Sequence, residues 1–238
     1  FDRDGFVVLE RIIDDASVAL LRERFDAVFS GTFESGLTPD EVNWQFDRSN
    51  PSLTRQICNA WKGDRFIASV ILDPAIGRAC AKLGRWPGAR INQDNLFWKP
   101  VHGAAIGFHQ DEAYEQWVEP SSMVSCWIAL DDTSANGGSV EYVRGSHLWG
   151  LDTRAVEFHA PQVPLQAVHE AAQSAGIDAR ERVPIVVPAG GGVFHHGRTW
   201  HGSLSNESNR DRRSIVAHCM SSEAQHHSQN LGTIYSRY

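Results

Sequence analysis

The first part of the chain combines one strand-like run with a segment of helical periodicity. Phe6–Leu9 is apolar and follows a glycine, which predicts a short strand. Apolar side chains then recur at helical spacing over Val18–Val28, with Asp14 or Asp15 placed to cap the helix and Gly31 placed to end it. The opening of the chain therefore predicts a strand followed by an amphipathic helix.

Two further segments have helical character. Asp73 and Pro74 are typical of an N-cap and a first helical position, and an apolar stripe over Ile76–Leu83 follows them. A third helix is predicted over residues 162–175, where Gly176 is placed to end it. Most of the predicted helical content thus lies before residue 90.

From about Arg90 onward the pattern is mainly that of strands. Apolar or alternating runs predict strands at 123–130, 184–188 and 213–219. The first of these runs is almost continuously apolar, which is typical of a central strand. We therefore expect one domain over residues 1–238, with a helical N-terminal part over about 1–89 and a jelly-roll core over about 90–222. The expected fold class is mainly β with flanking helices.

Composition and charge narrow the function classes. The chain has 238 residues and a formal charge of −7 with neutral histidines, which argues against a nucleic-acid partner because such partners favour basic surfaces. No stretch approaches the ~18 apolar residues of a membrane helix, and no secretory signal is recognisable. Cys58, Cys80, Cys126 and Cys219 lie far apart and form no C-x-x-C pair, which favours buried free thiols. We therefore expect a cytoplasmic protein that binds a small molecule and neither nucleic acid nor membrane.

The most informative chemistry is a spacing pattern of two histidines and one aspartate. His109 and Asp111 are two residues apart, so on a strand both side chains point to the same face and can bind one ion. One such pair is expected by chance in a chain with 11 histidines, but His201 follows a glycine-rich turn in a distant predicted strand and supplies a third ligand. Two imidazoles and one carboxylate occupy one face of an octahedral iron and leave three positions open. The set predicts a mononuclear non-haem Fe(II) centre.

The residues around the third histidine leave alternatives open. His195 and His196 are adjacent, so they point to opposite faces of a strand and at most one of them can join the site. We interpret both as polar groups near the site or in the core. Arg212 is placed to bind a dicarboxylate cosubstrate through a bidentate pair, whereas Arg213 points to the opposite face. The alternative is that the arginines of segment 210–213 form a solvated basic turn.

Several motifs together carry a family resemblance. They are Asp4–Leu9, Gln93–Pro100, His109-Gln110-Asp111, Asn136-Gly137-Gly138 through Gly145-Ser146-His147, and His201-Gly202-Ser203 with Asn206, Ser208 and Arg212. In this combination the chain resembles the phytanoyl-CoA dioxygenase (PhyH) family of Fe(II)- and 2-oxoglutarate-dependent oxygenases. The resemblance covers nearly the whole chain. Arg144 departs from it, because the family usually has proline there.

The resemblance implies a fold and a site. The fold is a double-stranded β-helix, a cupin-like jelly roll, in which His109, Asp111 and His201 are the catalytic iron ligands. Arg212, helped by Ser203, is implied to bind the C5 carboxylate of 2-oxoglutarate.

Further positions match the family with less specific roles. Trp127 and Gln93 match positions that often contact the cosubstrate, and Lys99 and Asn95 lie near it. The alternative for Trp127 is plain core packing. Halogenating relatives replace the ligating carboxylate with a small residue, so Asp111 argues against halogenation.

The resemblance also implies a reaction. A C–H bond of a small molecule is hydroxylated with O₂ while 2-oxoglutarate yields succinate and CO₂, and desaturation or cyclisation is open to the same chemistry. One alternative is a non-catalytic ligand-binding jelly roll with a vestigial metal site. Another is a cupin-like metalloenzyme that uses Zn or Mn without 2-oxoglutarate. Arg212 and the complete set of ligands argue against both.

The substrate itself is not specified by any motif. Segments 43–55 and 113–120 are the expected sources of pocket residues, namely Trp44, Phe46, Arg48, Arg55, Tyr114 and Trp117. Aromatic and arginine side chains together suggest a small substrate with apolar and anionic parts, and the alternative is that they pack a lid. No feature of the sequence indicates an oligomeric state.

Overall fold

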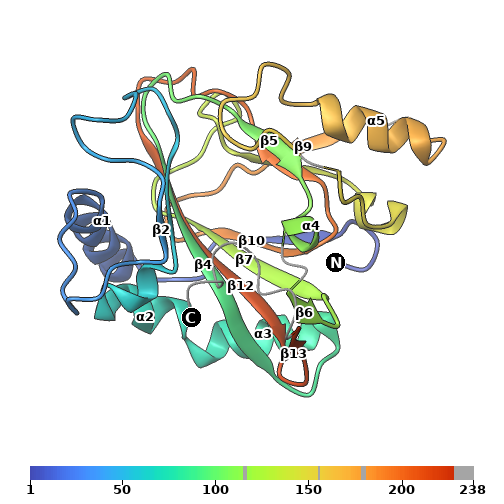
Figure 1. Ribbon diagram of the computed structural model, residues 1–238, viewed down its shortest axis with the longest axis horizontal. Helices are drawn as coiled ribbons and strands as arrows, with labels where there is room; N and C mark the ends of the chain where they lie inside the picture. Colours follow the sequence, from blue (N-terminus) through green and yellow to red (C-terminus); the bar gives the residue numbers. More distant parts are fainter. Residues whose placement is uncertain (115–116, 155, 178–180, 228–238) are drawn as a thin grey trace.

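Two antiparallel sheets face each other in the computed structural model of the chain (Figure 1). The structure describes residues 1–114, 117–154, 156–177 and 181–227. One sheet has seven strands and the other four, and strands far apart in the sequence alternate between them. This is the arrangement of a jelly roll, so the predicted fold class is confirmed.

The seven-stranded sheet is the larger wall. Its strands, in spatial order, are β1 (Phe6–Leu9), β10 (Gly192–His196), β7 (Met123–Ala129), β12 (Arg212–Ser221), β4 (Ala89–Lys99), β3 (Arg55–Cys58) and β2 (Glu41–Val42). The first part of the chain thus supplies β1 to one edge of this sheet, and β2 and β3 to the other.

The four-stranded sheet is the smaller wall. Its strands, in spatial order, are β5 (Ile106–His109), β11 (His201–Ser203), β8 (Val140–Val143) and β9 (Arg182–Pro184). A separate pair joins β6 (Val118–Glu119) to β13 (Gln225–His226). The predicted strand at 184–188 is therefore wrong in its bounds. The strand is earlier because Tyr142 and Val143 of β8 pair with Val183 and Arg182.

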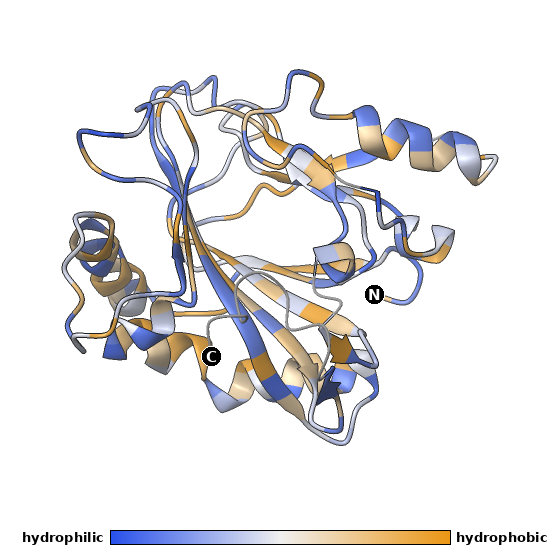
Figure 2. Ribbon diagram, viewed as in Figure 1, coloured by the Kyte–Doolittle hydropathy of each residue, from blue (hydrophilic) through white to orange (hydrophobic). Residues whose placement is uncertain are grey.

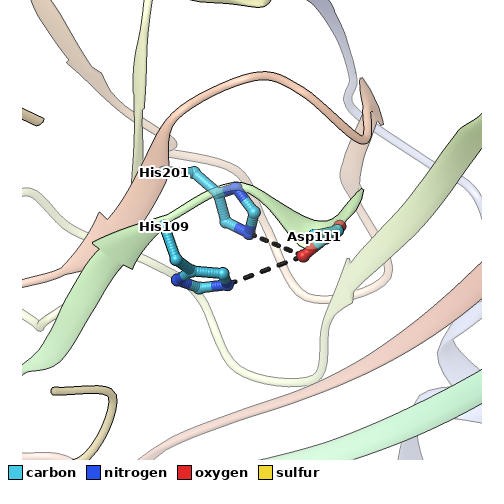
Figure 3. A group of neighbouring side chains, drawn as sticks. All are labelled: His109, Asp111 and His201. Atoms are coloured by element: carbon cyan, nitrogen blue, oxygen red, sulfur yellow. Dashed lines mark ion pairs between the residues drawn. The ribbon is translucent and has the colours of Figure 1, made fainter. Parts of the chain in front are cut away.

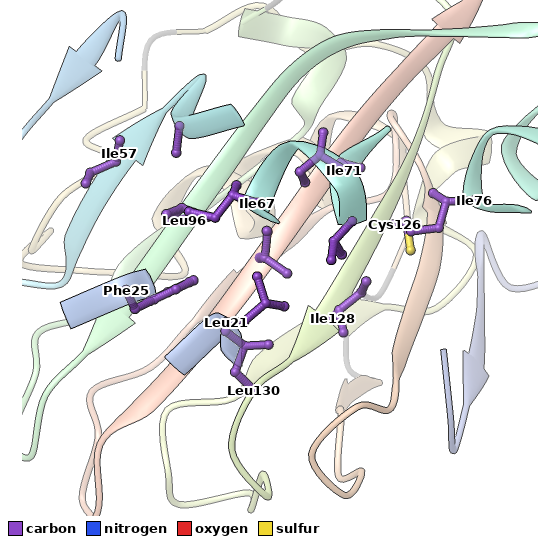
Figure 4. Close-up of a cluster of buried hydrophobic side chains, with 14 of the residues drawn as sticks. Leu21, Phe25, Ile57, Ile67, Ile71, Ile76, Leu96, Cys126, Ile128 and Leu130 are labelled. Atoms are coloured by element: carbon purple, nitrogen blue, oxygen red, sulfur yellow. The ribbon is translucent and has the colours of Figure 1, made fainter. Parts of the chain in front are cut away.

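Three helices cover the outer face of the large sheet. They are α1 (Asp15–Phe29), α2 (Arg65–Ile71) and α3 (Pro74–Gly84). Figure 4 shows their apolar side chains against those of the sheet, with Leu21 and Phe25 of α1 close to Leu96 and Ile128. This layer is the main hydrophobic core, and it covers the face of the large sheet opposite the cavity.

Two more helices lie outside this layer. They are α4 (Asp111–Tyr114), a single turn after β5, and α5 (Gln166–Ser174) beside the small sheet. Figure 2 shows both hydrophobic and hydrophilic residues along α5, which buries Val168, Ala171 and Ala172. Short 3₁₀ turns span Ala60–Lys62 and Ser146–Trp149. None of the described helices has the length and apolar character needed to cross a bilayer.

The predicted helix ends follow from local capping. The Asp14 carboxylate accepts the Ser17 N–H at 2.7 Å, and the Asp73 carboxylate accepts the Ala75 N–H at 2.7 Å. The third helix begins later than predicted, at Gln166, and no side chain caps it. The helix α2 was missed because its seven residues are too few to establish a periodicity.

Candidate metal centre

The small sheet and the helical turn that follows β5 bring His109, Asp111 and His201 to one point. His109 ends β5, His201 begins β11, and the two residues are cross-strand partners in the small sheet. Asp111 follows on the first turn of α4. Its Oδ1 lies 3.5 Å from His109 Nε2 and 3.4 Å from His201 Nε2, as Figure 3 shows. Among the described residues this is the one group of three side chains placed to hold a metal ion.

Hydrogen bonds orient both imidazoles for ligation. His109 Nδ1 lies 2.8 Å from the Gly107 carbonyl oxygen, and His201 Nδ1 lies 2.9 Å from the Thr199 carbonyl oxygen. A carbonyl can only accept, so each Nδ1 carries the proton and each Nε2 keeps a lone pair. Burial lowers the pKa of His109, and the neighbouring His201 lowers it further, which favours the neutral ligand form.

Two side chains donate hydrogen bonds to the second carboxylate oxygen of Asp111. Its Oδ2 accepts from the Ser125 hydroxyl at 2.7 Å and from His195 Nε2 at 2.9 Å. Tyr142 lies 2.9 Å from His195 Nδ1 and therefore donates its hydroxyl proton there. Burial raises the pKa of Asp111, but His201 and His218 outweigh it and hold that pKa well below 3.8. The carboxylate is thus charged, with Oδ1 directed to the two imidazoles.

A hydrogen-bond chain continues from Ser125 across the large sheet. His218 Nδ1 lies 2.7 Å from Ser125 Oγ, and His218 Nε2 lies 3.1 Å from Asn95 Nδ2. Because the amide nitrogen of Asn95 donates, His218 accepts at Nε2 and donates from Nδ1 to Ser125. Gln56 Nε2 in turn donates to Asn95 Oδ1 at 2.8 Å. All donors in this chain point toward Asp111.

Arg212 is buried at the other end of the site. It opens β12 and is 5% exposed, and burial lowers its pKa to about 10. Its Nε and Nη2 donate to the Gly138 carbonyl oxygen at 3.2 and 2.8 Å, and its Nη1 donates to Ser214 Oγ at 2.9 Å. A guanidinium has five N–H groups, so one remains on each terminal nitrogen. Two N–H groups on the neighbouring terminal nitrogens can bind a carboxylate as a bidentate pair.

Gly138 is required for this placement. Its φ is +63°, and an added Cβ would lie 2.6 Å from Lys99 Cδ and 2.9 Å from the Leu204 carbonyl oxygen. The glycine of the Asn136-Gly137-Gly138 motif therefore lets the backbone approach and offer its carbonyl to Arg212.

Ser203 is oriented by Lys99. The Lys99 ammonium, which is fully buried, donates to Ser203 Oγ at 2.8 Å and also to the Leu204 carbonyl oxygen. Because an ammonium has no acceptor, the Ser203 hydroxyl proton is left to donate elsewhere. Ser203 and Arg212 both line the cavity, so the end of the cavity is built to receive an anion.

One cavity of about 350 Å³ joins these parts. The metal-ligating side chains, Trp127, Ser203 and Arg212 all line it, as does Gln93. Gln93 is the cross-strand partner of His218, and Lys99 is the partner of Arg212. Six residues of extended strand span about 20 Å, so Gln93 lies toward the iron-binding end of the sheet. Its predicted contact with the cosubstrate, like that of Trp127, stays a prediction.

The residues expected to form the substrate pocket are only partly present in it. Tyr114 and Trp117 line the cavity, while residues 115 and 116 lie outside the described residues. Arg55 points to the opposite face of β3, where its guanidinium lies 4.1 Å from the Trp44 ring centroid and 4.5 Å from that of Trp98. The exposed side chains of Phe46 and Arg48 do not reach the cavity either.

Arg213 points away from Arg212, as alternation predicts, but not to solvent. It donates to both carboxylate oxygens of Asp131, at 3.1 and 2.9 Å, on the helix-covered face of the sheet. Arg144, where the sequence departs from the family pattern, pairs with Asp4 at 2.8 Å and Glu181 at 3.0 Å. Its turn lies outside the cavity.

Sequence reasoning missed several polar residues that support the site. Ser125, Tyr142 and His218 lie in apolar strand runs that look like plain core. Gln110 stands inside the His109-Gln110-Asp111 motif without a predicted role of its own. Its side chain bonds the backbone of Gly150, Arg198 and Asp152, and so ties three loops to the ligand segment. Alternation along a strand next to a metal ligand could have indicated these residues. It can be applied only when the pairing register between the strands is known.

Comparisons with known proteins agree with this geometry. Residues 1–214 match the family described as Phytanoyl-CoA dioxygenase (PhyH). A zebrafish (Danio rerio) protein named phytanoyl-CoA dioxygenase domain-containing protein 1 is 27% identical over 150 residues, which are 63% of this chain and 51% of that protein. A probable alpha-ketoglutarate-dependent hypophosphite dioxygenase of Stutzerimonas stutzeri is 24% identical over 215 residues, 89% of this chain and 73% of that protein. The chain spans about half the length of the vertebrate relatives it matches.

Solved structures share the fold. The epimerase SnoN, in complex with Fe³⁺, alpha-ketoglutarate and nogalamycin RO, superimposes with a TM-score of 0.70 at 20% identity. The match covers 96% of this chain and 83% of that one.

Proposed function

Because the chain belongs to the phytanoyl-CoA dioxygenase family, we propose that it is an Fe(II)- and 2-oxoglutarate-dependent oxygenase that hydroxylates a C–H bond of a small molecule. One observation carries the proposal. A buried two-histidine, one-carboxylate site shares its cavity with a buried arginine that has two N–H groups to spare. The family, the fold and this chemistry converge on iron and 2-oxoglutarate as the groups the site holds.

The residues present fit these groups. His109 and His201 offer neutral Nε2 atoms and Asp111 offers Oδ1, which is the donor set of a non-haem Fe(II) oxygenase. Arg212 and Ser203 are placed to bind the distal carboxylate of 2-oxoglutarate, and Trp127 of β7 borders the space between the two ends.

When bound, iron and 2-oxoglutarate supply the oxidation, in which O₂, 2-oxoglutarate and R–H give R–OH, succinate and CO₂. The chain's own residues bind and orient. Asp111 stays anionic because Ser125 and His195 donate to its outer oxygen. The buried cations hold one end of the cosubstrate, and the surrounding apolar side chains exclude water, which strengthens each of these charge interactions.

A binding experiment and a matched pair of variants test the function. Anaerobic addition of 2-oxoglutarate to the Fe(II)-loaded chain is expected to produce a weak visible charge-transfer band, and air is then expected to yield succinate. Asp111→Ala should abolish both the band and succinate release, because it removes a ligand. Asp26→Ala, on the exposed face of α1, should change neither. Absence of the band in the unmodified chain would favour the alternative of a metal-binding jelly roll that does not use 2-oxoglutarate.

The cellular location is also a proposal. All four cysteines are buried free thiols, which supports a reducing compartment such as the cytoplasm.

A further inference from the structure

The cavity has a second polar wall, built by β2, β3 and β4. We call it the acceptor wall, and its side chains are Glu41, Gln56, Cys58, Gln93 and Asn95. Cross-strand pairing brings them together, because Cys58 is opposite both Glu41 and Asn95. We propose that the acceptor wall binds the primary substrate, and that this substrate is a small molecule that carries no negative charge and presents several hydrogen-bond donors. The proposal rests on the proposed oxygenase function, since it assigns the substrate of the same cavity.

Gln93 gives the first reason. Its side chain is 6% exposed and lines the cavity, and its Oε1 has no hydrogen-bond partner among the described residues. A buried carbonyl oxygen without a donor costs about 1–3 kcal/mol. A ligand that donates to Gln93 Oε1 removes this cost, so the position selects for a donor group.

Gln56 and Asn95 give the second reason. Gln56 uses its amide nitrogen to donate to Asn95 Oδ1 at 2.8 Å, and the same nitrogen lies 3.6 Å from Cys58 Sγ. Asn95 uses its own amide nitrogen on His218. These amide nitrogens therefore donate within the protein, and the carbonyl oxygen of Gln56, which lines the cavity, accepts no hydrogen bond from the described residues.

Charge gives the third reason. Glu41 adds a carboxylate at the exposed edge of the wall. Among the described residues that line the cavity, Arg212 carries the one guanidinium or ammonium group, and it lies at the cosubstrate end. Burial lowers the pKa of His159, which disfavours a charged imidazole at this position. An anionic substrate at the acceptor wall would lie next to a carboxylate and amide carbonyls, with no cationic side chain of the wall to pair with it.

This result reverses an expectation from the sequence. An anionic substrate part was expected because Arg48 and Arg55 lie in a segment thought to line the pocket. Arg55 instead lies between two indole rings on the other face of β3, and Arg48 is exposed outside the cavity.

Ligand-observed NMR on the full chain tests the proposal. The sample is anaerobic and contains Fe(II) and saturating 2-oxoglutarate, so that the cosubstrate fills the end of the cavity at Arg212. The probes are glucosamine, glucose and glucuronate, which share a ring and differ in one charged group, together with a size-matched fragment set of amines, neutral amides and alcohols, and carboxylates. We expect amines and neutral donors to bind and carboxylates to be at least fivefold weaker. Equal binding of all classes, preference for carboxylates, or no binding of any class overturns the proposal.

Variants locate the binding. Glu41→Gln should weaken amine probes at least fivefold and leave neutral probes within twofold, whereas Gln93→Leu should weaken both classes. Glu10→Gln, an exposed carboxylate outside the cavity, is the control. Affinity for 2-oxoglutarate is measured on each variant and should change less than twofold. If Gln93→Leu weakens 2-oxoglutarate instead, Gln93 belongs to the cosubstrate and the proposal fails. If 2-oxoglutarate does not bind the unmodified chain, the proposed function fails, whatever the ranking of the probe affinities.

Discussion

Lys99 and Arg212 are cross-strand partners, and both cationic side chains are buried. Burial lowers the pKa of each, and the charge of Arg212 lowers that of Lys99 further. Neither forms a salt bridge with a carboxylate in the part of the chain that the structure describes. Two like charges in a buried place are costly. The carboxylates of Glu141 and Asp131 offset part of this cost, since they raise the pKa of Lys99 and Arg212 respectively, and a dicarboxylate cosubstrate would supply further opposite charge.

Loss of Arg212 should therefore act on cosubstrate affinity. We expect Arg212→Ala to raise the KM for 2-oxoglutarate by at least about 30-fold, since a buried charge-assisted pair contributes roughly 2–5 kcal/mol. Fe(II) affinity, measured by titration, should remain within a few-fold. Arg213→Ala is the matched control, because Arg213 pairs with Asp131 on the other face of the sheet. A large effect of Arg213→Ala on KM with a silent Arg212→Ala would contradict the assignment.

Cosubstrate binding should also take up a proton. The pKa of Lys99 is well below 10.5 in the ligand-free chain, because of burial and then of Arg212. A bound carboxylate near Lys99 raises that pKa, so the neutral amine takes up a proton at pH values between the free and the bound pKa. Affinity for 2-oxoglutarate should consequently fall as pH rises through that interval.

Calorimetric titrations in two buffers of different ionisation enthalpy measure this proton uptake. Lys99→Met, which keeps the length of the side chain and removes the charge, should abolish it. Unchanged uptake in Lys99→Met would assign the proton to another group.

The hydrogen bonds behind Asp111 should tune metal affinity. We expect Ser125→Ala to weaken Fe(II) binding about 10- to 100-fold, because partners of a ligating carboxylate have effects of this size. His195→Phe should act in the same direction, since His195 Nε2 donates to the same oxygen. His196→Phe is the control, because its side chain lies on the opposite face of β10. Competition with a metal-binding dye measures the Fe(II) affinities. Equal affinities of the three variants would show that the hydrogen bonds to Asp111 do not tune metal binding.

The helix layer should carry much of the stability. Leu21→Ala removes a fully buried side chain between α1 and the large sheet, and we expect a loss of about 2–5 kcal/mol in the free energy of unfolding. Leu37→Ala, at a position 60% exposed, should change it by less than about 0.5 kcal/mol. Urea unfolding followed by circular dichroism measures both.

The features that the sequence predicted are local ones. Asp14 and Asp73 cap helices through contacts with residues two or three positions away, so their role can be predicted from the neighbouring sequence alone. His109 and Asp111 were predicted as a pair from their spacing, but the expected geometry was wrong, because β5 ends at His109 and Asp111 lies on the first turn of α4 rather than on the strand. His201 was predicted from the glycine-rich turn and the strand around it, and Arg212 from its place at the start of a strand; the family motifs then agreed with both.

The features that the sequence did not predict depend on register. Ser125 and His218 lie beside Asp111 only because β7 pairs with β12 and β10 in one particular alignment. The pocket-facing side of β3 was missed in the same way. A shift of one residue decides whether Arg55 or Gln56 faces the cavity, and no local pattern fixes that shift.

The acceptor wall is carried largely by β2 and β3, which form one edge of the large sheet, whereas the iron ligands and Arg212 lie on β5, α4, β11 and β12. β2 is the edge strand and pairs with β3 alone, so changes in β2 disturb fewer pairings than changes in the interior of the sheet. Substitutions in this wall can thus change substrate selectivity while the iron ligands and Arg212 stay the same. Libraries that randomise Glu41 on β2 should accordingly yield many folded, iron-competent proteins with new selectivity.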